Sequence, residues 1–405
     1  MWSLKPASSM RTKRMKSYIT AGNFGGFTLM EPISTKRSRR DTNMRKSSRL
    51  SSNMTQVMKP QIWEKFPEDL FKDVLARLPF ATVIRFRTVC HQWNNLITSQ
   101  SFSHYRAQVS QSNPWFFLAF EDVTYNATLP KNNYKAVSDP FMKRWIYPNT
   151  FEIPALPVSS AGGLVCSFDF FNRNIYVCNP LTKSIKKLPI GSIIWQRHSV
   201  MTMNKSGGYR VLRFSHREYE IYDSVTKNWS HLGSIPGYIV PPNDYICNHV
   251  SIDDTVYFKY VGPERIVSCN TSTGVWAQHL IPVPLHSYFL SLAESDGRIM
   301  LMGILYENDA RFVCIWEVQK VTFSLKEVDR FPCSECYGIF RGLTCWGNKG
   351  VLLCCLRSYT TYRIVTYNIA TRKWVKVRVP YKRKLLEKKN YVFGYAFQPC
   401  FTAMP

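Results

Sequence analysis

Cysteine and histidine side chains are the residues of this 405-residue chain whose spacing could support metal or nucleophilic chemistry. Cys333 and Cys336 form a Cys-x-x-Cys pair, and Cys345, Cys354 and Cys355 follow it. A zinc site needs a second spaced pair, and the twelve cysteines and eight histidines supply none in the sequence. The sequence also lacks a phosphate loop, a dinucleotide fingerprint and a nucleophile elbow. We therefore expect no metal, no cofactor and no catalytic residue.

Positive charge dominates the composition. Lys plus Arg number 53 against 27 Asp plus Glu, a formal net charge of +26. Such an excess points to nucleic acid, an acidic protein or an acidic membrane surface. The longest apolar run is Trp115–Phe120, far short of the roughly 20 residues that a membrane span needs, and the N-terminus lacks the apolar core of a secretory signal. We expect reduced cysteines and a location in the nucleus, the cytoplasm or both.

The positive charge is densest in residues 1–60, which hold thirteen basic and two acidic residues. The apolar residues of this stretch keep no helical or strand period, so we predict a disordered basic tail. Lys36, Arg37, Arg39 and Arg40 form a run that is typical of nuclear import. A transit peptide and a merely solvated tail remain alternatives.

Residues 61–106 are predicted to form three short helices. Pro67-Glu68-Asp69 suits the start of the first helix, and an apolar stripe runs from Leu70 to Leu78. Pro79 ends this helix, and the next two are expected over residues 82–89 and 91–97. Three short helices make a poor independent core, so apolar surface should remain for a partner.

These helical residues resemble an F-box in order and spacing, with Phe66 where Leu is usual and His91 where Lys or Arg is common. The resemblance implies binding to a Skp-type adaptor and, through it, to a cullin ubiquitin ligase. The residues that it assigns to adaptor binding are Phe66, Pro67, Leu70, Val74, Leu75, Leu78, Pro79, Val83, Arg87, Val89, Cys90 and Trp93.

Residues 113–402 contain a repeat. A polar or acidic residue ends a β-rich run and an aromatic or apolar residue follows six positions later, with 40 to 51 residues between copies. The six copies are Asp139/Trp145, Asn179/Ile185, Asp223/Trp229, Asn270/Trp276, Glu317/Phe323 and Asn368/Trp374. Each copy also contains an upstream hairpin with a turn signal, so each supplies about four antiparallel strands. Six such units predict a six-bladed β-propeller, in which the first residue caps its own turn and the aromatic packs between blades.

The repeat resembles the divergent kelch repeats of plant F-box/kelch-repeat proteins, although a related F-box-associated β-domain remains an alternative. Val392–Phe397 reads as one further strand. We predict that it pairs with the first blade near Trp115–Phe120 and closes the ring, which would remove exposed strand edges.

The sequence thus predicts an α+β multidomain protein: a disordered tail, a three-helix F-box and an all-β six-bladed kelch-type propeller. The implied role is the non-catalytic substrate-recognition subunit of a Skp-cullin-F-box (SCF-type) ubiquitin ligase, with the target protein on the propeller rim. Alternatives are a basic propeller that binds nucleic acid and a propeller that binds a small molecule. The rim residues expected to contact the target are aromatic or Arg residues in predicted loops: Phe170, Phe171, Arg173, Trp195, Arg197, Tyr238, Tyr245, Tyr337 and Tyr359.

Overall fold

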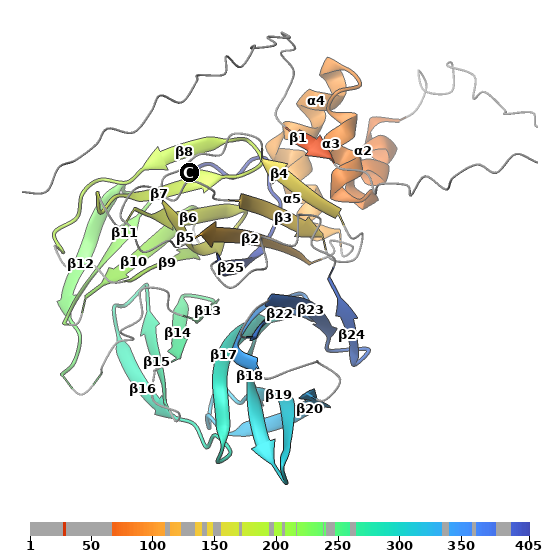
Figure 1. Cartoon of the computed structure of the whole chain (residues 1–405). Helices are drawn as coiled ribbons and strands as arrows, with labels where there is room; N and C mark the ends of the chain where they lie inside the picture. Colours follow the sequence, from red (N-terminus) through yellow and green to blue (C-terminus); the bar gives the residue numbers. More distant parts are fainter. Residues whose placement is uncertain are drawn as a thin grey trace, which may run out of the picture.

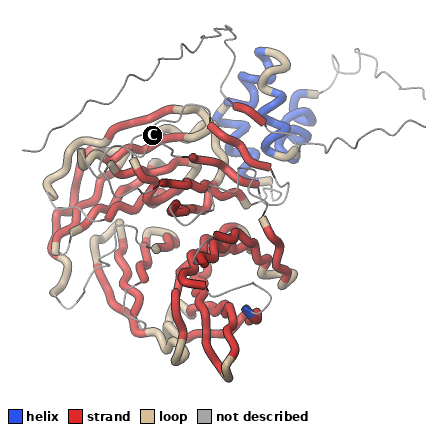
Figure 2. Tube along the Cα trace, in the orientation of Figure 1, coloured by secondary structure: helices blue, strands red, loops and turns tan. Residues whose placement is uncertain are grey.

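The computed structural model places short helices first along the chain and antiparallel sheets after them (Figures 1 and 2). It describes residues 27–29, 67–109, 114–122, 134–139, 144–148, 155–169, 172–193, 198–204, 207–215, 217–237, 239, 248–259, 265–333, 340–358, 362–377 and 390–405. Within these ranges no helix is long and apolar enough to cross a membrane. The same ranges contain no group of three or more His, Cys, Asp or Glu side chains that could hold a metal ion.

Four helices form the N-terminal module: α2 (Glu68–Arg77), α3 (Phe80–Phe86), α4 (His91–Thr98) and α5 (Gln100–Gln108). The first three confirm the predicted helices. The expectation of only three is wrong, because α5 continues the module beyond them. Ser99 caps α5 by accepting a hydrogen bond from the Phe102 amide at 3.2 Å. The helix escaped prediction because its sequence carries almost no apolar stripe, with Phe102 as its buried residue.

Residues 156–376 form five four-stranded antiparallel sheets, which are five blades of a β-propeller. The strands of each blade lie in chain order, as the repeat predicts. They are β5 (Leu156–Ala161), β6 (Leu164–Phe168), β7 (Ile175–Asn179), β8 (Ser184–Lys187), β9 (His198–Met203), β10 (Tyr209–Phe214), β11 (Glu218–Asp223), β12 (Asn228–Ser234), β13 (His249–Ile252), β14 (Thr255–Lys259), β15 (Arg265–Asn270), β16 (Trp276–Leu280), β17 (Ser287–Ser295), β18 (Arg298–Glu307), β19 (Ala310–Val318), β20 (Leu325–Pro332), β21 (Phe340–Asn348), β22 (Val351–Ser358), β23 (Tyr362–Asn368) and β24 (Lys373–Lys376).

A further sheet has five strands and joins both ends of the chain. Its order is β1-β4-β3-β2-β25, with bounds β1 (Phe27–Leu29), β2 (Trp115–Asp122), β3 (Tyr134–Asp139), β4 (Arg144–Pro148) and β25 (Asn390–Phe397). Trp115 lies opposite Phe397 in the antiparallel β2–β25 pair, which confirms the predicted pairing of the C-terminal strand. The three residues of β1 depart from the expectation of a tail without regular structure, because they pair with the outer strand β4. The rest of residues 1–60, including the basic run from Lys36 to Arg40, lies outside the described residues.

The aromatic of the repeat contacts the preceding blade, as predicted. Trp276 lies 5.4 Å from Phe214 of the blade before it, measured between ring centroids. Trp374 lies 5.3 Å from Phe331 in the same way. Trp229 instead donates a hydrogen bond of 2.9 Å to a carbonyl oxygen beyond the end of β8. These contacts place one large side chain at each of three blade boundaries, where it adds apolar burial to the sheet pairing.

The polar residue of the repeat caps its own turn, as predicted. The Asp223 carboxylate accepts a hydrogen bond of 2.8 Å from the amide two residues on, and the Asn270 carbonyl oxygen does the same at 2.9 Å. Asn368 accepts from the amide three residues on at 2.9 Å. Glu317 differs, since its carboxylate lies 3.8 Å from Arg298. The repeat therefore encodes both a turn and a blade contact within seven residues.

One ion pair is almost fully buried. Arg213 and Glu220 are opposite residues on β10 and β11, and their side chains are 4% and 2% exposed. The Glu220 carboxylate also accepts hydrogen bonds from the amide and hydroxyl of Ser192, at 3.0 and 2.8 Å. Arg213 donates to the Ile193 carbonyl at 2.8 Å. Burial lowers the pKa of the Arg213 guanidinium. The pair thus fastens the connection between β8 and β9 to the blade.

Replacing Glu220 by Gln should lower the free energy of unfolding by about 3–5 kcal/mol, because Arg213 would be left buried without its counter-charge. Urea unfolding followed by far-UV circular dichroism measures this loss. The control is Glu317→Gln, which breaks a more exposed pair and should cost less than about 1 kcal/mol. Equal losses in the two variants would contradict the role assigned to the buried pair.

Candidate functional site

Half of the residues assigned to adaptor binding are exposed on the surface, where a partner could contact them. Leu70, Val74 and Val89 are 54%, 49% and 58% exposed, which is high for large apolar side chains. Leu70 and Val74 are four residues apart on α2 and so share one helix face. Pro67, Pro79 and Cys90 are exposed as well. An apolar stripe that its own module leaves uncovered is the expected form of a protein-binding surface.

The other predicted residues pack within the helical module. Leu75 and Val83 are 0% and 1% exposed and form its core with Ile97 and Phe102. Trp93 is half-buried, with its ring 4.7 Å from that of Phe71. Because Leu75 and Val83 are buried, they can contribute to adaptor binding only through the shape of the module.

Leu78 and Arg87 complete the described part of the predicted set. Leu78 and Arg87 are half-buried, and Leu78 and Pro79 line a cavity between the helices and the propeller. Phe66 lies outside the described residues.

A polar triad fixes α2 against α5. The Tyr105 hydroxyl donates to the Asp73 carboxylate at 2.6 Å, and Arg77 donates to the same carboxylate at 3.0 Å. Both contacts, that of Tyr105 first, lower the pKa of Asp73. The triad sets the rotation of α2 and hence the direction in which Leu70 and Val74 point.

Arg106 closes the C-terminal end of α2. Its guanidinium donates to the carbonyl oxygens of Leu75, Ala76 and Leu78 at 3.3, 3.4 and 3.1 Å. The Leu75 carbonyl also accepts from the Leu78 amide at 3.2 Å, and the carbonyls at this end of the helix form the negative end of its dipole. Burial lowers the pKa of Arg106 to about 10, and the group lies 5.4 Å from the centre of the Phe80 ring. One side chain of α5 thus provides hydrogen-bond donors for the carbonyl groups at the C-terminal end of α2.

Replacing Arg106 by Met should destabilise the helical module by about 1–3 kcal/mol, because hydrogen bonds from a charged donor to buried carbonyls would be lost. Hydrogen exchange of the α2 amides should accelerate about tenfold or more, while β-sheet amides keep their protection. Arg85→Met, which changes an exposed arginine of α3, is the matched control. Unchanged exchange of α2 in Arg106→Met would refute the capping role.

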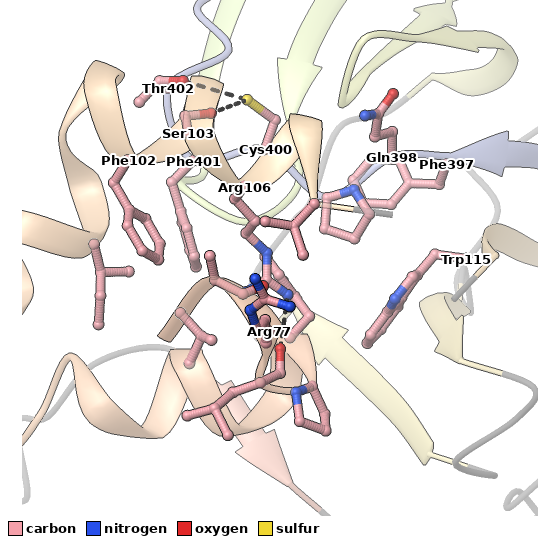
Figure 3. A pocket seen from close by; sticks show the side chains of 18 of the residues that line it. Arg77, Phe102, Ser103, Arg106, Trp115, Phe397, Gln398, Cys400, Phe401 and Thr402 are labelled. Carbon is pink, nitrogen blue, oxygen red and sulfur yellow. Dashed lines mark hydrogen bonds between the residues drawn. The ribbon is translucent and has the colours of Figure 1, made fainter. Parts of the chain in front are cut away.

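The C-terminal segment joins the helices to the propeller. The Phe401 ring stacks on Phe80 of α3 at 5.2 Å, and the Arg87 guanidinium lies 4.6 Å from the centre of the Phe401 ring. The ring of Phe80 also meets that of Trp115, the first residue of β2, at 5.5 Å. The Ser103 hydroxyl of α5 lies 3.3 Å from the Cys400 thiol, as Figure 3 shows. The rings of Phe80, Trp115 and Phe401 therefore join the helical module, the five-stranded sheet and the C-terminal segment in one aromatic cluster.

The propeller holds this segment at two points. Asn179 donates from its side-chain amide to the carbonyls of Cys400 and Ala403 at 2.8 and 2.9 Å. Gly163 has φ +85°, and a Cβ there would lie 2.7 Å from both Cys400 Cβ and the Gln398 carbonyl oxygen. Only glycine fits this approach without displacing the segment.

Phe401→Ala should loosen the helices from the propeller without unfolding either part, at a cost of about 2 kcal/mol for a half-buried ring. Hydrogen exchange should rise at the start of α3 and in residues 398–405, and limited proteolysis should cut the segment sooner. Met404→Ala changes an exposed residue of the same segment, 73% exposed, and should have no effect. Equal protection in the two variants would show that Phe401 does not hold the junction.

The two ends of the propeller strands differ. β25 contacts both β5 and β21, β5 contacts β9, and β17 contacts both β13 and β21, so the first strand of each blade lies innermost. Gly162 and Lys349 lie in turns between first and second strands, and both line the cavity against the helices. The helical module thus occupies the end of the propeller that carries these turns. Connections between blades, and those from second to third strands, lie at the opposite end.

One of the nine predicted rim residues lies in the described part of the chain. Arg173 is exposed between β6 and β7. The remaining eight lie outside the described residues: Phe170, Phe171, Trp195, Arg197, Tyr238, Tyr245, Tyr337 and Tyr359.

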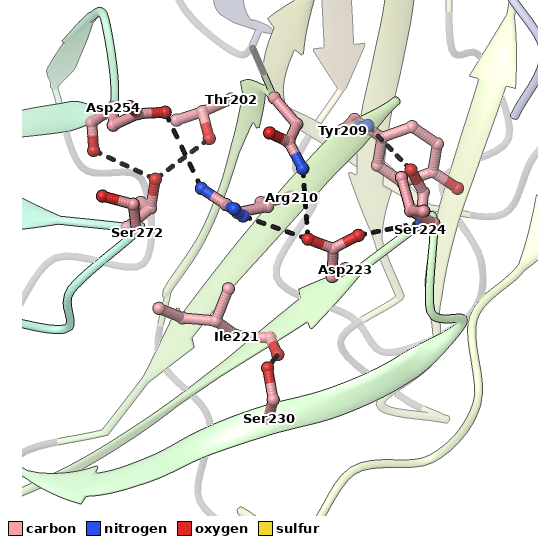
Figure 4. A network of polar contacts seen from close by, with 12 residues as sticks. Thr202, Tyr209, Arg210, Ile221, Asp223, Ser224, Ser230, Asp254 and Ser272 are labelled. Carbon is pink, nitrogen blue, oxygen red and sulfur yellow. Dashed lines mark hydrogen bonds and ion pairs between the residues drawn. The ribbon is translucent and has the colours of Figure 1, made fainter. Parts of the chain in front are cut away.

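A polar cluster links two blades at the end that carries the helices (Figure 4). Arg210 of β10 lies 3.1 Å from the Asp223 carboxylate of its own blade and 3.7 Å from Asp254 of the next blade. The Thr271 hydroxyl donates to the Asp254 carbonyl at 3.0 Å. Because each carboxylate already faces a cation, we assign the cluster to blade-to-blade attachment rather than to catalysis.

Comparisons with known proteins agree with this architecture. The F-box domain model matches residues 63–105. F-box only protein 6 of Arabidopsis thaliana is 42% identical over 400 residues, which cover 94% of this chain and 83% of that protein. An F-box/kelch-repeat protein of the same plant is 26% identical over 377 residues, 85% of this chain and 89% of that protein. The chain belongs to the plant F-box/kelch-repeat family. Protein UNUSUAL FLORAL ORGANS of Arabidopsis thaliana is 24% identical over 395 residues, 87% of this chain and 88% of that protein.

Members with an F-box and a propeller act in general as substrate-recognition adaptors of SCF-type ligases, and F-box domains bind Skp-type adaptors. Such adaptors are generally non-catalytic. For this F-box/kelch-repeat protein, the sequence identified the F-box motif. It did not identify Phe80, Arg106 and Phe401, which hold the helices together and against the propeller. Phe80 follows the predicted helix stop at Pro79 and could have been found as a helix start. Phe401 has no such signal, because its contact joins residues more than 300 positions apart.

Proposed function

We propose that this protein is the substrate-recognition subunit of a Skp-cullin-F-box ubiquitin ligase, whose helices bind the Skp-type adaptor and whose propeller holds the target protein for ubiquitination. The carrying observation is the uncovered apolar surface of Leu70, Val74 and Val89. Covering apolar surface releases roughly 25 cal/mol per Å², so these side chains can supply a large part of an association energy.

The five-stranded sheet serves as the sixth blade in this proposal. Its inner strand β25 contacts β5 on one side and β21 on the other. It shares apolar clusters with both neighbours: Phe117 with Val165, and Phe116 with Leu353. Pairing of the last strand of the chain with β2 would close the ring and fix the position of every blade relative to the helices.

The target docks on the propeller end that faces away from the helices. An exposed apolar patch supports this placement, with Leu285, Tyr288 and Tyr306 at 83%, 53% and 41% exposed. Phe289 belongs to the patch and is 43% exposed at φ +54°, in a β-bulge that turns the next residue, Leu290, inward. Backbone strain that holds an aromatic toward solvent is typical of binding sites.

The chain would contribute position rather than chemistry. Helices and target surface lie at opposite ends of one propeller, and the aromatic junction around Phe401 restricts their relative motion. A target held there has a high effective concentration at the ubiquitin-loaded enzyme. Function in the nucleus, the cytoplasm or both fits the basic run Lys36–Arg40 as an import signal.

The double variant Leu70→Ser, Val89→Ser should weaken binding to a Skp-type adaptor at least tenfold while the protein stays folded, since both side chains are exposed. Isothermal titration or a pull-down with the full chain measures this, with circular dichroism as the folding check. Ile185→Ser with Val375→Ser is the matched control, because these propeller residues are 48% and 49% exposed. Leu75→Ala should instead lose stability, as its side chain is buried.

Two outcomes would oppose the proposal. A well-folded full chain that does not bind the adaptor would remove the ligase role, and undiminished binding by the double variant would place the contact elsewhere.

A further inference from the structure

A cavity of about 340 Å³ lies between the helical module and the propeller. Figure 3 shows the side chains that converge on it from α2, α5, the start of β2 and the C-terminal segment. Its apolar wall includes Leu78, Phe80, Trp115 and Phe401. The volume is within the range of small-ligand sites, and such sites commonly form where two domains meet.

The charged residues that line the cavity are all basic: Arg77, Arg106 and Lys349. Arg77 is paired with Asp73, and the guanidinium of Arg106 is used by the carbonyls at the end of α2. Among the described residues, Lys349 has neither a hydrogen-bond acceptor nor an ion-pair partner within 4 Å. Asp296 is the acid whose charge acts on Lys349. It does not line the cavity, and its carboxylate lies 3.9 Å from the Arg298 guanidinium. The cavity therefore offers an ammonium group near the Arg106 guanidinium, with no acid among the residues that line it.

Hydrogen bonds of its two neighbours fix the backbone at Lys349, in the turn between β21 and β22. Asn348 donates to the carbonyl of Trp115 at 2.8 Å, and the Gly350 amide donates to the Ser295 hydroxyl at 2.9 Å. Lys349 itself has φ +47°, a left-handed conformation that is uncommon for a residue with a side chain. Partial burial and the nearby Arg106 lower the pKa of Lys349, and Asp296 opposes this shift; the residue as a whole is exposed, so its ammonium group is open to a ligand.

We propose that this cavity binds a small organic anion, with a flat apolar body against Phe80, Trp115 and Phe401 and its carboxylate or similar acid group against Lys349. A carboxylate would supply the negative charge that the lining residues lack, and it would accept charge-assisted hydrogen bonds from the ammonium. The ligand would touch the helices, the propeller and the C-terminal segment at once. Binding would therefore stabilise the contact between the adaptor-binding module and the target-binding propeller. This inference rests on the proposed ligase role and makes the relative position of the two parts depend on the ligand.

The test compares three probes of one shape on the full chain: 2-naphthoate, its neutral amide 2-naphthamide, and the cation 2-naphthylmethylammonium. Isothermal titration should show naphthoate binding at least tenfold more tightly than the amide, and no binding of the cation. Lys349→Met should erase the preference for naphthoate over the amide, and Lys349→Arg should retain it. Lys373→Met, which removes an exposed lysine of the outer strand β24, is the matched control and should change nothing.

Several results would overturn the site. These are equal affinities for naphthoate and the amide, equal effects of Lys349→Met and Lys373→Met, and no binding of either naphthalene by a chain whose circular dichroism shows it folded. The second result would mean unselective attraction of anions to a basic protein. Titration of the Skp-type adaptor into the same preparation keeps the two ideas separate, because adaptor binding depends on Leu70 and Val89 and not on Lys349.

Discussion

The pairing of β2 with β25 is the constraint on which the rest of this structure depends. It runs from Trp115 opposite Phe397 to Asp122 opposite Asn390, and so joins the first long strand of the propeller to the last. Because the two strands are antiparallel, β2 begins where β25 ends. The helices that precede β2 and the segment that follows β25 are thereby delivered to the same end of the propeller. Because these two segments meet at one end of the propeller, the aromatic junction and the cavity form there, and the helical module packs against that end.

Local interactions are enough to build each blade, but not to place the blades. Within a blade, the capped turns at Asp223, Asn270 and Asn368 set the hairpins. Between blades, Trp276 and Trp374 reach back to the sheet before them. The pairing of β25 with β2 adds a contact between the two ends of the series, and it covers strand edges that would otherwise be free to pair with other chains. Among the described residues, apolar side chains are exposed on α2 and, at the opposite end, around Tyr288.

The sequence predicted the parts of the fold that repeat or that carry local signals. Spacing alone located the hairpins, the turn caps and the blade-boundary aromatics, and the apolar pattern located three of the four helices. It failed for α5, whose sequence carries almost no apolar stripe, and for the fifth strand contributed by Phe27–Leu29. It also could not separate the exposed Leu70 from the buried Leu75, since both belong to one stripe and only packing divides them. The roles of Phe401 and Lys349 come from contacts between distant segments, which no local pattern records.

The seat of the helices at Phe401 has a consequence for the order in which the chain is made. Phe80 leaves the ribosome 321 residues before its stacking partner Phe401. At about 5–20 residues per second, translation keeps them apart for roughly 15–60 s. During that interval the helical module has its own small core but no seat, and its aromatic face toward the propeller is open. That face can be buried only after Phe401 has been made, so the junction forms later than the strands that lie between the two residues.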